Sequence, residues 1–321
     1  MRCNDETVTP ADSAQLMKEL FLLAELDTEA EDLRREMDFS FSFAGVGRFR
    51  VNAYRQRGTL AAVLRSVPFE LPDSGKLHIP DSILSLAENQ NGIILVTGAA
   101  GSGKSTTLTC MIDKINSERP GHIVTIEDPI EFLHKHKKSI ISQREIGIDT
   151  ESYSDALRAA LRQSPNVILL GEMRDNETMS IAMTAAETGQ LVLSTLHTVG
   201  AANTVDRIID GFPTNQQQQI RMQLSMVLKA VISQQLLPDT NGTLYPVFEV
   251  MVVNNAIRTM IRENKTHQIE TVMQTTPGMQ TMDSAVFKLF SEGIISEETA
   301  VEYASSPAMM SKKIELSRGK Q

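Results

Sequence analysis

Short apolar runs alternate in the middle of the chain with segments whose apolar residues recur at helical spacing. The runs predict strands and the intervening segments predict helices. The predicted strands are residues 122–126, 167–170 and 191–193, and the predicted helices are residues 154–162 and 176–187. Strands that alternate with helices predict a parallel sheet with crossover helices.

A fourth apolar run, rich in β-branched residues, occupies residues 93–97 and is typical of a buried parallel strand. A glycine-rich segment follows it. After that segment the apolar residues recur at i, i+3, i+4 and i+7, as Leu108, Met111, Ile112 and Ile115. This spacing predicts one buried stripe of a helix, so the order here is strand, loop and helix.

The N-terminal residues begin with a predicted helix. Thr9, Pro10 and Asp12 resemble a capping box with proline at the first helical position. An apolar stripe is expected on the following helix, at Leu16, Leu20, Leu23 and Ala24. The charge run at residues 29–36 favours a solvated helix face.

From Asp38 the pattern changes to period two, which indicates a half-buried hairpin. Gly45 and Gly47 mark the turn between two alternating segments. The apolar positions of the first segment are Phe39, Phe41 and Phe43, and those of the second are Phe49, Val51 and Ala53.

Three prolines and Gly75 punctuate the stretch from Pro68 to Pro80, which is the predicted linker. We therefore expect an N-terminal domain at residues 1–70, a linker at 71–80 and a second domain at 81–321.

Asp81 or Ser82 is expected to cap a short helix before the strand at residues 93–97. From Asn215 onward the sequence predicts mainly helices, with one strand-like break at residues 244–252.

Composition narrows the possible classes of protein. The 321 residues are enough for about two domains, and the net charge is 31 − 40 = −9. That charge argues against attraction to nucleic acid, although a local basic patch stays open. Two cysteines, Cys3 and Cys110, cannot build a disulfide scaffold or a four-cysteine zinc site, and Cys110 is expected to be a small buried hydrophobe.

The sequence shows no apolar run near the ~18 residues of a membrane span and no visible signal peptide. We therefore expect a cytosolic protein whose membrane association depends on partners.

The glycine-rich segment carries specific chemistry, because residues 98–105 fit the P-loop pattern G-x-x-x-x-G-K-[ST]. Backbone amides of such a loop point at phosphate oxygens, Lys104 reaches the β- and γ-phosphates, and Ser105 offers its hydroxyl to Mg²⁺. The sequence predicts that a nucleoside triphosphate binds at Gly98, Ala99, Ala100, Gly101, Ser102, Gly103, Lys104, Ser105 and Thr106.

Polar residues follow the predicted strands, at the sheet edge where ligands of α/β proteins bind. Glu172 has the position of a Walker-B carboxylate for Mg²⁺. Glu127, Asp128 and Glu131 form a second acidic group suited to positioning the attacking water. His197 can sense the γ-phosphate or bind the acidic groups, and helix capping or a solvated loop stays open for it.

Five arginines lie within residues 48–65. For any single one a solvated surface role is as plausible as a phosphate role. For five of them near a nucleotide site, some phosphate role is favoured.

Six motifs together resemble one family. They are residues 47–52, the P-loop, residues 125–131 (Asp box), 171–175 (Walker B), 195–198 (His box) and 256–263. With these motifs the chain, from about Asp38 to Ile295, resembles the PilT-type retraction ATPases of type IV pili, within the secretion ATPase superfamily. The last motif resembles the A-I-R-N-L-I-R-E sequence associated with retraction.

The resemblance implies an α/β fold: a RecA-like P-loop NTPase domain with a smaller PAS-like α+β N-terminal domain. It also implies a homo-hexameric motor that uses ATP and Mg²⁺ for pilin depolymerisation and twitching motility. Such a motor works at the inner face of the cytoplasmic membrane through a platform protein. It contacts pilin only indirectly.

The resemblance also assigns roles to residues. Glu131 is the expected catalytic glutamate, and Arg50 and Arg65 match phosphate-sensing arginines of the N-terminal domain. Ser105 and Glu172 are the expected metal-site residues. The complete expected catalytic set is Glu131, Glu172, Glu127, His197, Arg50, Arg65 and Arg207.

Three features depart from the family pattern. The family's opening strand falls before Met1, so the PAS-like domain is expected to lack its first strand and to leave a sheet edge unpaired. Gln190 replaces the first histidine of the His box. Thr259 and Met260 replace Asn and Leu of the retraction motif.

Other functions stay open on the sequence. A pilus-assembly or secretion ATPase of the same superfamily is one, although most of these carry a four-cysteine zinc element. A nucleotide-binding ring subunit that regulates a partner without its own turnover is another. A nucleic-acid motor is disfavoured by the net charge and the motif set.

Overall fold

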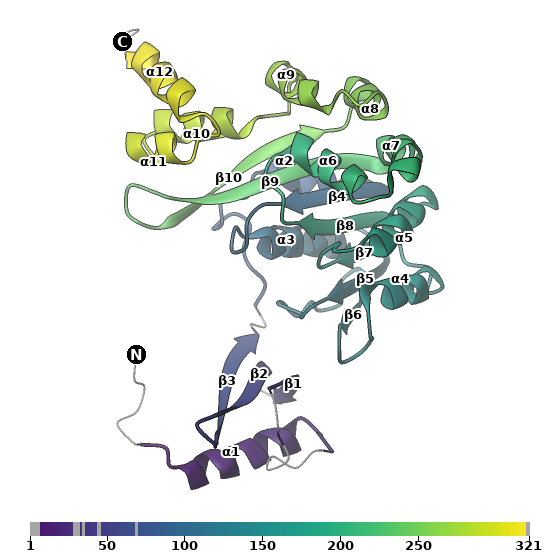
Figure 1. Ribbon diagram of the computed structural model, residues 1–321, viewed down its shortest axis with the longest axis vertical. Helices are drawn as coiled ribbons and strands as arrows, with labels where there is room; N and C mark the ends of the chain where they lie inside the picture. The colour runs from purple at the N-terminus through teal and green to yellow at the C-terminus, as the bar shows by residue number, and fades with distance from the viewer. Residues whose placement is uncertain (1–6, 28–32, 34–35, 44–45, 68–69, 319–321) are drawn as a thin grey trace. The chain divides into compact units, whose positions relative to one another are not determined.

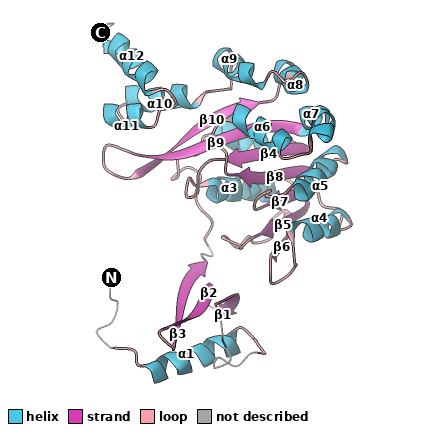
Figure 2. Cartoon of the chain, in the orientation of Figure 1, coloured by secondary structure: helices cyan, strands magenta, loops and turns pink. Residues whose placement is uncertain are grey.

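A computed structural model describes residues 7–27, 33, 36–43, 46–67 and 70–318 (Figures 1 and 2). The chain divides into an N-terminal unit, residues 1–71 with 131–133, and a second unit, residues 72–130 with 134–321. The predicted domain and linker boundaries stay a prediction. The predictions made for Cys3, Gly45, Pro68 and most of the charge run at residues 29–36 lie outside the described residues.

The first helix begins as its sequence predicts. α1 (Pro10–Leu23) follows Thr9, whose hydroxyl accepts from the Asp12 amide at 3.3 Å. The Asp12 carboxylate accepts in return from the Thr9 amide at 2.9 Å, which completes the capping box.

The predicted apolar stripe of α1 was wrong for Leu16 and Leu23, which are 52% and 44% exposed. It is confirmed for Leu20 and Ala24, which pack against the buried cluster that contains Met17 and Phe21. The helix carries apolar residues on two adjacent faces, and its sheet covers the face with Phe21, whose ring packs edge-on against Phe39 at 5.4 Å between centroids. Tertiary packing therefore selects the buried face.

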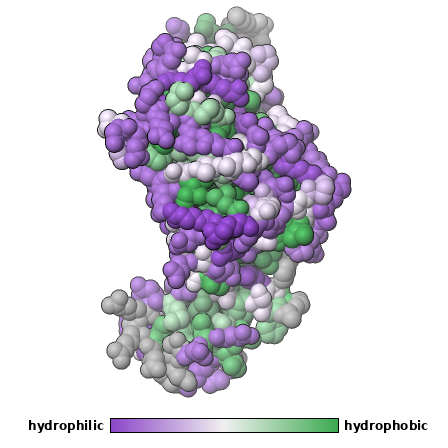
Figure 3. Space-filling model, turned by 90° about the vertical axis from the view of Figure 1, so that its right-hand side faces the viewer, coloured by the Kyte–Doolittle hydropathy of each residue, from purple (hydrophilic) through white to green (hydrophobic). Residues whose placement is uncertain are grey.

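The N-terminal sheet has three antiparallel strands in the order β1-β2-β3: β1 (Met37–Phe43), β2 (Gly47–Gln56) and β3 (Thr59–Val67). The predicted hairpin is confirmed by β1 and β2, and β3 extends it. Val51 and Ala53 are buried with Phe39 and Phe41, as the alternation predicts. Hydrophobic residues also reach the surface of this unit (Figure 3), and they include Leu64 of β3.

The second unit is built on a sheet whose strand order is β10-β9-β4-β8-β7-β5-β6. Neighbouring strands are parallel except β9 and β10. The four predicted strands at the P-loop and in the middle of the chain are confirmed, and β6 is additional. The bounds are β4 (Gly92–Thr97), β5 (Gly121–Glu127), β6 (Ser139–Glu145), β7 (Val167–Leu170), β8 (Leu191–Leu196), β9 (Leu228–Pro238) and β10 (Leu244–Val252).

Helices cover both faces of this sheet, and the P-loop strand shows why. Ile93 and Leu95 of β4 enter one apolar cluster, and Ile94 and Val96 enter the other. The first cluster also contains residues of α4 (Tyr153–Leu161), α5 (Asn176–Glu187), α6 (Ala201–Asp210) and α7 (Thr214–Val227). The second contains residues of α2 (Asp81–Leu84), η2 (Ser85–Glu88) and α3 (Lys104–Glu118). All six residues of β4 are buried.

The C-terminal part contains α8 (Asn255–Arg262), η3 (Thr266–Gln268), α9 (Ile269–Thr275), α10 (Met282–Ser291), α11 (Glu297–Glu302) and α12 (Pro307–Arg318). The strand predicted at residues 244–252 is confirmed as β10. The prediction of helix elsewhere after Asn215 was wrong for β9. This strand pairs on both sides, so its apolar run lacks the alternation that marks a half-buried strand.

α2 follows Pro80 and has no side-chain cap, so the prediction that Asp81 or Ser82 caps it was wrong. In the part of the chain that the structure describes, every helix is too short or too polar to cross a bilayer.

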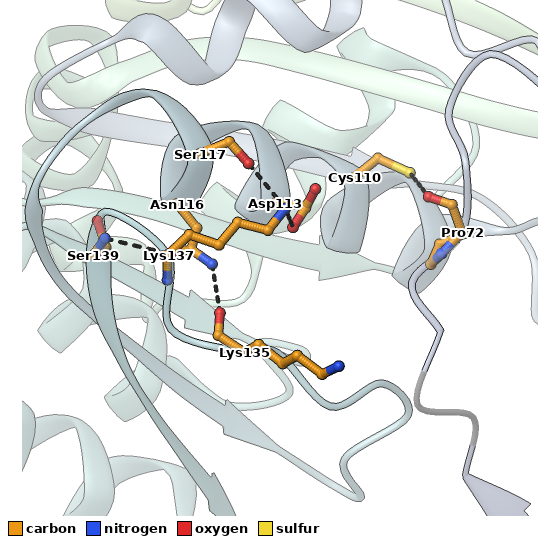
Figure 4. A network of polar contacts seen from close by, with 8 residues as sticks. All are labelled: Pro72, Cys110, Asp113, Asn116, Ser117, Lys135, Lys137 and Ser139. Carbon is orange, nitrogen blue, oxygen red and sulfur yellow. Dashed lines mark hydrogen bonds and ion pairs between the residues drawn. The ribbon is translucent and has the colours of Figure 1, made fainter.

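Asn116, fully buried on α3, connects the P-loop helix to the segment before β6 (Figure 4). Its amide donates to the Lys135 carbonyl at 2.8 Å, and its Oδ1 accepts from the amides of Lys137 at 3.1 Å and Ser139 at 3.3 Å. One side chain therefore pairs three backbone groups, two in the segment before β6 and one at the first residue of β6.

Cys110, on the same helix, behaves as the sequence predicts. It is 6% exposed, and its thiol donates to the Pro72 carbonyl at 3.5 Å (Figure 4). Burial, with the negative charges of Asp113 and Asp73, raises the pKa of the thiol to about 11. A protonated, buried thiol is a packing group.

Replacing Asn116 by alanine should lower the free energy of unfolding by about 3 kcal/mol, because three hydrogen bonds from one buried side chain to the backbone are lost. Urea unfolding followed by circular dichroism measures this loss. Ser117→Ala is the matched control, since Ser117 accepts only from the flexible Lys137 ammonium, and it should cost less than about 1 kcal/mol. Equal unfolding midpoints for the two variants would contradict the role of Asn116.

Candidate functional site

The P-loop connects the end of β4 to the start of α3. Gly98 and Ser102 are buried, whereas Ala99, Ala100 and Gly101 are exposed at its tip. Lys104 is 8% exposed, and its ammonium donates to the carbonyls of Gly98 at 2.9 Å and Ala99 at 2.7 Å. The lysine thus folds over the loop, where it neutralises the region in which phosphate oxygens would lie. Ser105 and Thr106 follow in the first turn of α3, half-buried.

Two glycines of the loop have positive φ angles and lie close to Gln234 of β9. Gly98 has φ +143 and Gly103 has φ +88. A Cβ on Gly98 would overlap the carbonyl oxygen of Gln234, and a Cβ on Gly103 would lie 2.8 Å from the Gln234 side-chain nitrogen. Glycine therefore lets the loop pack directly against β9.

Glu172 lies directly beyond β7 between two basic groups. Its Oε1 accepts from the Arg174 guanidinium, and its Oε2 lies 3.3 Å from His197 Nε2. The hydrogen bond to Glu172 raises the pKa of Arg174, and Asp128, whose carboxylate lies 3.7 Å from the same guanidinium, adds to the shift. The structure thus joins the ends of β5, β7 and β8 through one ionic cluster, which we call the Glu172 cluster: Asp128, Glu172, Arg174 and His197.

The backbone beneath the Glu172 cluster is held by hydroxyls of β8. Thr195 donates to the Gly171 carbonyl at 2.5 Å, and Ser194 donates to the Leu170 carbonyl at 3.0 Å. Tyr153 of α4 is also close, since a Cβ on Gly171 would lie 2.8 Å from its hydroxyl. Burial, with the charges of Asp128 and Glu172, raises the pKa of Tyr153, so its hydroxyl stays protonated.

Glu127, at the end of β5, is held from two sides. Its Oε1 accepts from the Thr125 hydroxyl at 2.6 Å and from the Gln143 amide at 3.3 Å. Gln143 in turn accepts from the His134 amide at 2.8 Å. The described contacts of Glu127 are therefore with polar side chains of β5 and β6, and its predicted part in an acidic group with Asp128 and Glu131 stays a prediction.

Glu131, Arg50 and Arg65 belong to the N-terminal unit, so their part in the nucleotide site stays a prediction. Glu131 is exposed, and the backbone just before it is anchored by Ile130, whose amide donates to Glu145 at 3.2 Å. Arg50 of β2 and Arg65 of β3 are direct cross-strand partners. Their face of the sheet is opposite to the one that carries Val51.

Arg207 is exposed on α6, and its part in the nucleotide site stays a prediction. Gln190 precedes β8 whereas His197 follows it, so the two are about 20 Å apart along the strand. The Gln190 side chain accepts from Thr188 at 2.8 Å, which is a local contact.

The motif resembling the retraction sequence forms α8. Ile257 and Ile261 are fully buried, and the polar side chains bond locally on the opposite face. Thr259 accepts from Arg262 at 3.1 Å, and Arg258 donates to Asn255 at 3.3 Å.

Gln234, Arg174 and Tyr153 were missed as site residues. Arg174 stands inside the quoted Walker-B segment, so its position beside Glu172 was readable from the sequence. Gln234 and Tyr153 carry no sequence signal, because only the packing of β9 and α4 brings them to the loop and to Gly171.

Among the described residues, no three His, Cys, Asp or Glu side chains are grouped to hold a metal ion. The predicted metal-site residues, Ser105 and Glu172, follow β4 and β7 respectively. β8 separates these two strands in the sheet, and all three are parallel. Both residues therefore lie at one edge of the sheet.

The chain is similar to a known protein family and to characterised pilus proteins. Residues 76–244 match the family described as Type II/IV secretion system protein. A "Twitching motility protein" of Neisseria gonorrhoeae is 50% identical over 280 residues, which are 86% of this chain and 75% of that protein. The "Type IV pilus retractation ATPase PilT" of Pseudomonas aeruginosa is 46% identical over 274 residues, or 85% of this chain and 80% of that protein.

A solved structure agrees with these relatives. The "Crystal Structure of the Pilus Retraction Motor PilT and Bound ADP" superposes with a TM-score of 0.82 at 52% identity. The match covers 87% of this chain and 80% of that chain. The predicted fold class, a RecA-like ATPase domain with a smaller N-terminal domain, is confirmed by this likeness.

His134 should make the unfolding free energy sensitive to acid. Burial lowers its pKa to about 4 from 6.5, and its Nδ1 has no partner among the described residues. The folded state thus disfavours the charged ring. Stability is complete above pH 6.5 and falls as the pH drops toward 4.

Between pH 7 and pH 5 the wild type should lose about 2 kcal/mol more than His134→Leu, which has no ring to charge. Urea unfolding at each pH measures the difference, and His267→Gln, at an exposed position, should follow the wild type. Parallel pH curves for wild type and His134→Leu would show that the buried ring does not contribute.

Proposed function

This chain belongs to the family of PilT-type type IV pilus retraction ATPases, and on that premise we propose that it hydrolyses ATP to power retraction of a type IV pilus. The main structural support is the position of the P-loop and the Glu172 cluster in one sheet. The P-loop, with Lys104 folded over it, follows a fully buried strand, and the Glu172 cluster lies at the ends of parallel strands of the same sheet. Phosphate-binding and acidic groups therefore share one sheet edge.

ATP would bind with its phosphates in the loop. The positive φ angles of Gly98, Gly101 and Gly103 turn backbone amides inward, as in other anion-binding loops. Lys104 would exchange its two carbonyl contacts for phosphate oxygens, which are better partners for an ammonium. The loop thus has both donors and charge for a triphosphate.

Mg²⁺ would be held at the same site. The Ser105 hydroxyl follows the P-loop lysine, as in P-loop enzymes, and Glu172, at the end of a parallel strand of the same sheet, would supply a carboxylate. When bound, the ion supplies charge that neutralises the phosphate oxygens. Arg174 and His197 hold the Glu172 carboxylate in place on either side.

Hydrolysis also needs a base and positive charge from outside the loop. We assign the base to Glu131, with Glu127 as an auxiliary group, and we assign a γ-phosphate contact to His197. Arg50 and Arg65 support the charge role, because like charges placed directly across two strands repel unless an anion lies on that face. Arg207 is a further candidate for contact with phosphate.

We further propose that six copies assemble into a ring that engages an inner-membrane platform protein. The sites would then lie at the cytoplasmic face of the membrane, and pilin would be reached only through that partner. The support is the likeness over most of the chain to a protein described as a pilus retraction motor.

The proposed function is tested by the steady-state ATPase activity of the purified chain, with its mass measured by light scattering in the same buffer. Mg²⁺-dependent turnover in a hexamer is expected. Tight ATP binding without turnover would instead favour a regulatory ring subunit, and a monomer would contradict the proposed ring.

Lys104→Ala should reduce turnover by at least about a hundredfold, because the phosphates lose their cationic donor. ATP hydrolysis is measured by phosphate release. Lys114→Ala is the control on the same helix, since Lys114 pairs with Glu118 at the surface, and it should retain wild-type turnover. Normal turnover in Lys104→Ala would contradict the assignment of the P-loop.

Glu131→Gln should retain ATP binding but lower kcat by at least about a hundredfold, because the amide cannot accept the proton of the attacking water. Single-turnover hydrolysis with bound ATP measures the chemical step. Glu127→Gln is the comparison, and it should lose far less. If the two losses were reversed, the base would be Glu127.

A further inference from the structure

Gln234, on β9, is a buried polar residue outside every motif that carries the proposed chemistry. It is 3% exposed. It follows Ser233, the last residue of β9 that pairs with β4, where Ser233 lies opposite Thr97. Gln234 therefore stands beside the first residue of the P-loop, on the side of β4 opposite to β8 and the Glu172 cluster.

The Gln234 side chain bonds to the first turn of the P-loop helix. Its Oε1 accepts from the Thr107 hydroxyl at 2.7 Å. Thr107 is fully buried, so neither group can exchange this bond for water without opening the site.

Gln234 also packs against two glycines of the P-loop. Its backbone carbonyl oxygen occupies the space that a Cβ on Gly98 would need, and its side-chain nitrogen would lie 2.8 Å from a Cβ on Gly103. Glycine has the largest backbone freedom of any residue, so a loop with glycines at these positions is held in one conformation by contacts with a neighbouring element. Gln234 of β9 provides these contacts.

We propose that Gln234 is a positioning residue for the nucleotide, whose side chain holds the P-loop in its phosphate-binding shape through Thr107 and Gly103. The inference rests on the proposed function, because it concerns the same nucleotide site. The contacts of Gln234 are with the loop and with the helix that follows it, so its effect is on the shape of the loop. A neutral amide does this without placing a negative charge behind the phosphates, whereas a carboxylate at this position would repel them.

The test measures binding of ATPγS with Mg²⁺ to the full-length chain by calorimetry, together with KM and kcat for ATP. Gln234→Ala should weaken ATPγS binding about fivefold, the effect of one buried hydrogen bond, and should raise KM more than it lowers kcat. Gln234→Glu should weaken binding further. Gln235→Ala, the same change on the opposite face of β9, is the matched control and should bind as the wild type does.

Thr107→Val removes the same hydrogen bond from the other partner and should give the same loss. Because the two residues act as a pair, the double variant should lose no more than either single variant. This cycle also tests the proposal if Gln234→Ala does not fold.

Wild-type affinity in a folded Gln234→Ala, or fully additive losses in the double variant, would overturn the inference. So would a lower thermal midpoint with unchanged KM, since that is the result of a purely structural role. In each of these results the wild type still binds ATPγS, so the proposed function stands. A wild type that binds no nucleotide would overturn both.

Discussion

Parallel pairing of β4 with β8 on one side and β9 on the other is the constraint on which the nucleotide site depends. The hydrogen-bonded pairing fixes where each strand ends, and the residues that follow these ends form the site. Residues of β4 and β8 are all buried, so their hydrogen bonds have no competition from water. A shift of one residue in either pairing would move the P-loop relative to its neighbours and turn the side chains to the other face.

The ends of these strands are further held by side chains that bond to backbone. Ser194 and Thr195 of β8 each donate to a carbonyl at the end of β7, directly before Glu172. The Glu172 carboxylate is thus placed by the sheet and then oriented by its own charge partners. The Glu172 carboxylate can therefore keep its position while the charge on a bound triphosphate changes during hydrolysis.

Charge in this protein is organised locally. The net charge of −9 describes the whole surface, whereas the site alternates basic and acidic groups over a few ångströms. Lys104 is buried and binds two carbonyl oxygens of the loop, so its charge is compensated, whereas Arg174 is exposed and pairs with the Glu172 carboxylate. The N-terminal sheet has the opposite arrangement, because Arg50 and Arg65 stand together. That difference is consistent with a face that meets an anion supplied from elsewhere.

The sequence alone determined the features that depend on local pattern. The capped start of α1, the hairpin with alternating phenylalanines and the strand, loop and helix of the P-loop all follow from spacing within about ten residues. The motifs also predicted that Glu172 and His197 meet at one sheet edge, because residues that follow parallel strands lie there, and the two side chains do lie 3.3 Å apart. The catalytic roles of these two residues, and of Glu131 and Arg50, remain predictions.

Only the tertiary structure decided which apolar surfaces are covered and which distant segments touch. α1 offers two apolar faces, and the sheet buries the one with Met17 and Phe21. β9 has a helix-like apolar run, and pairing on both sides makes it a strand. Gln234 reaches Thr107 across 127 positions of sequence. Such contacts depend on how elements pack, and the free energy of packing is shared among residues that no local pattern relates.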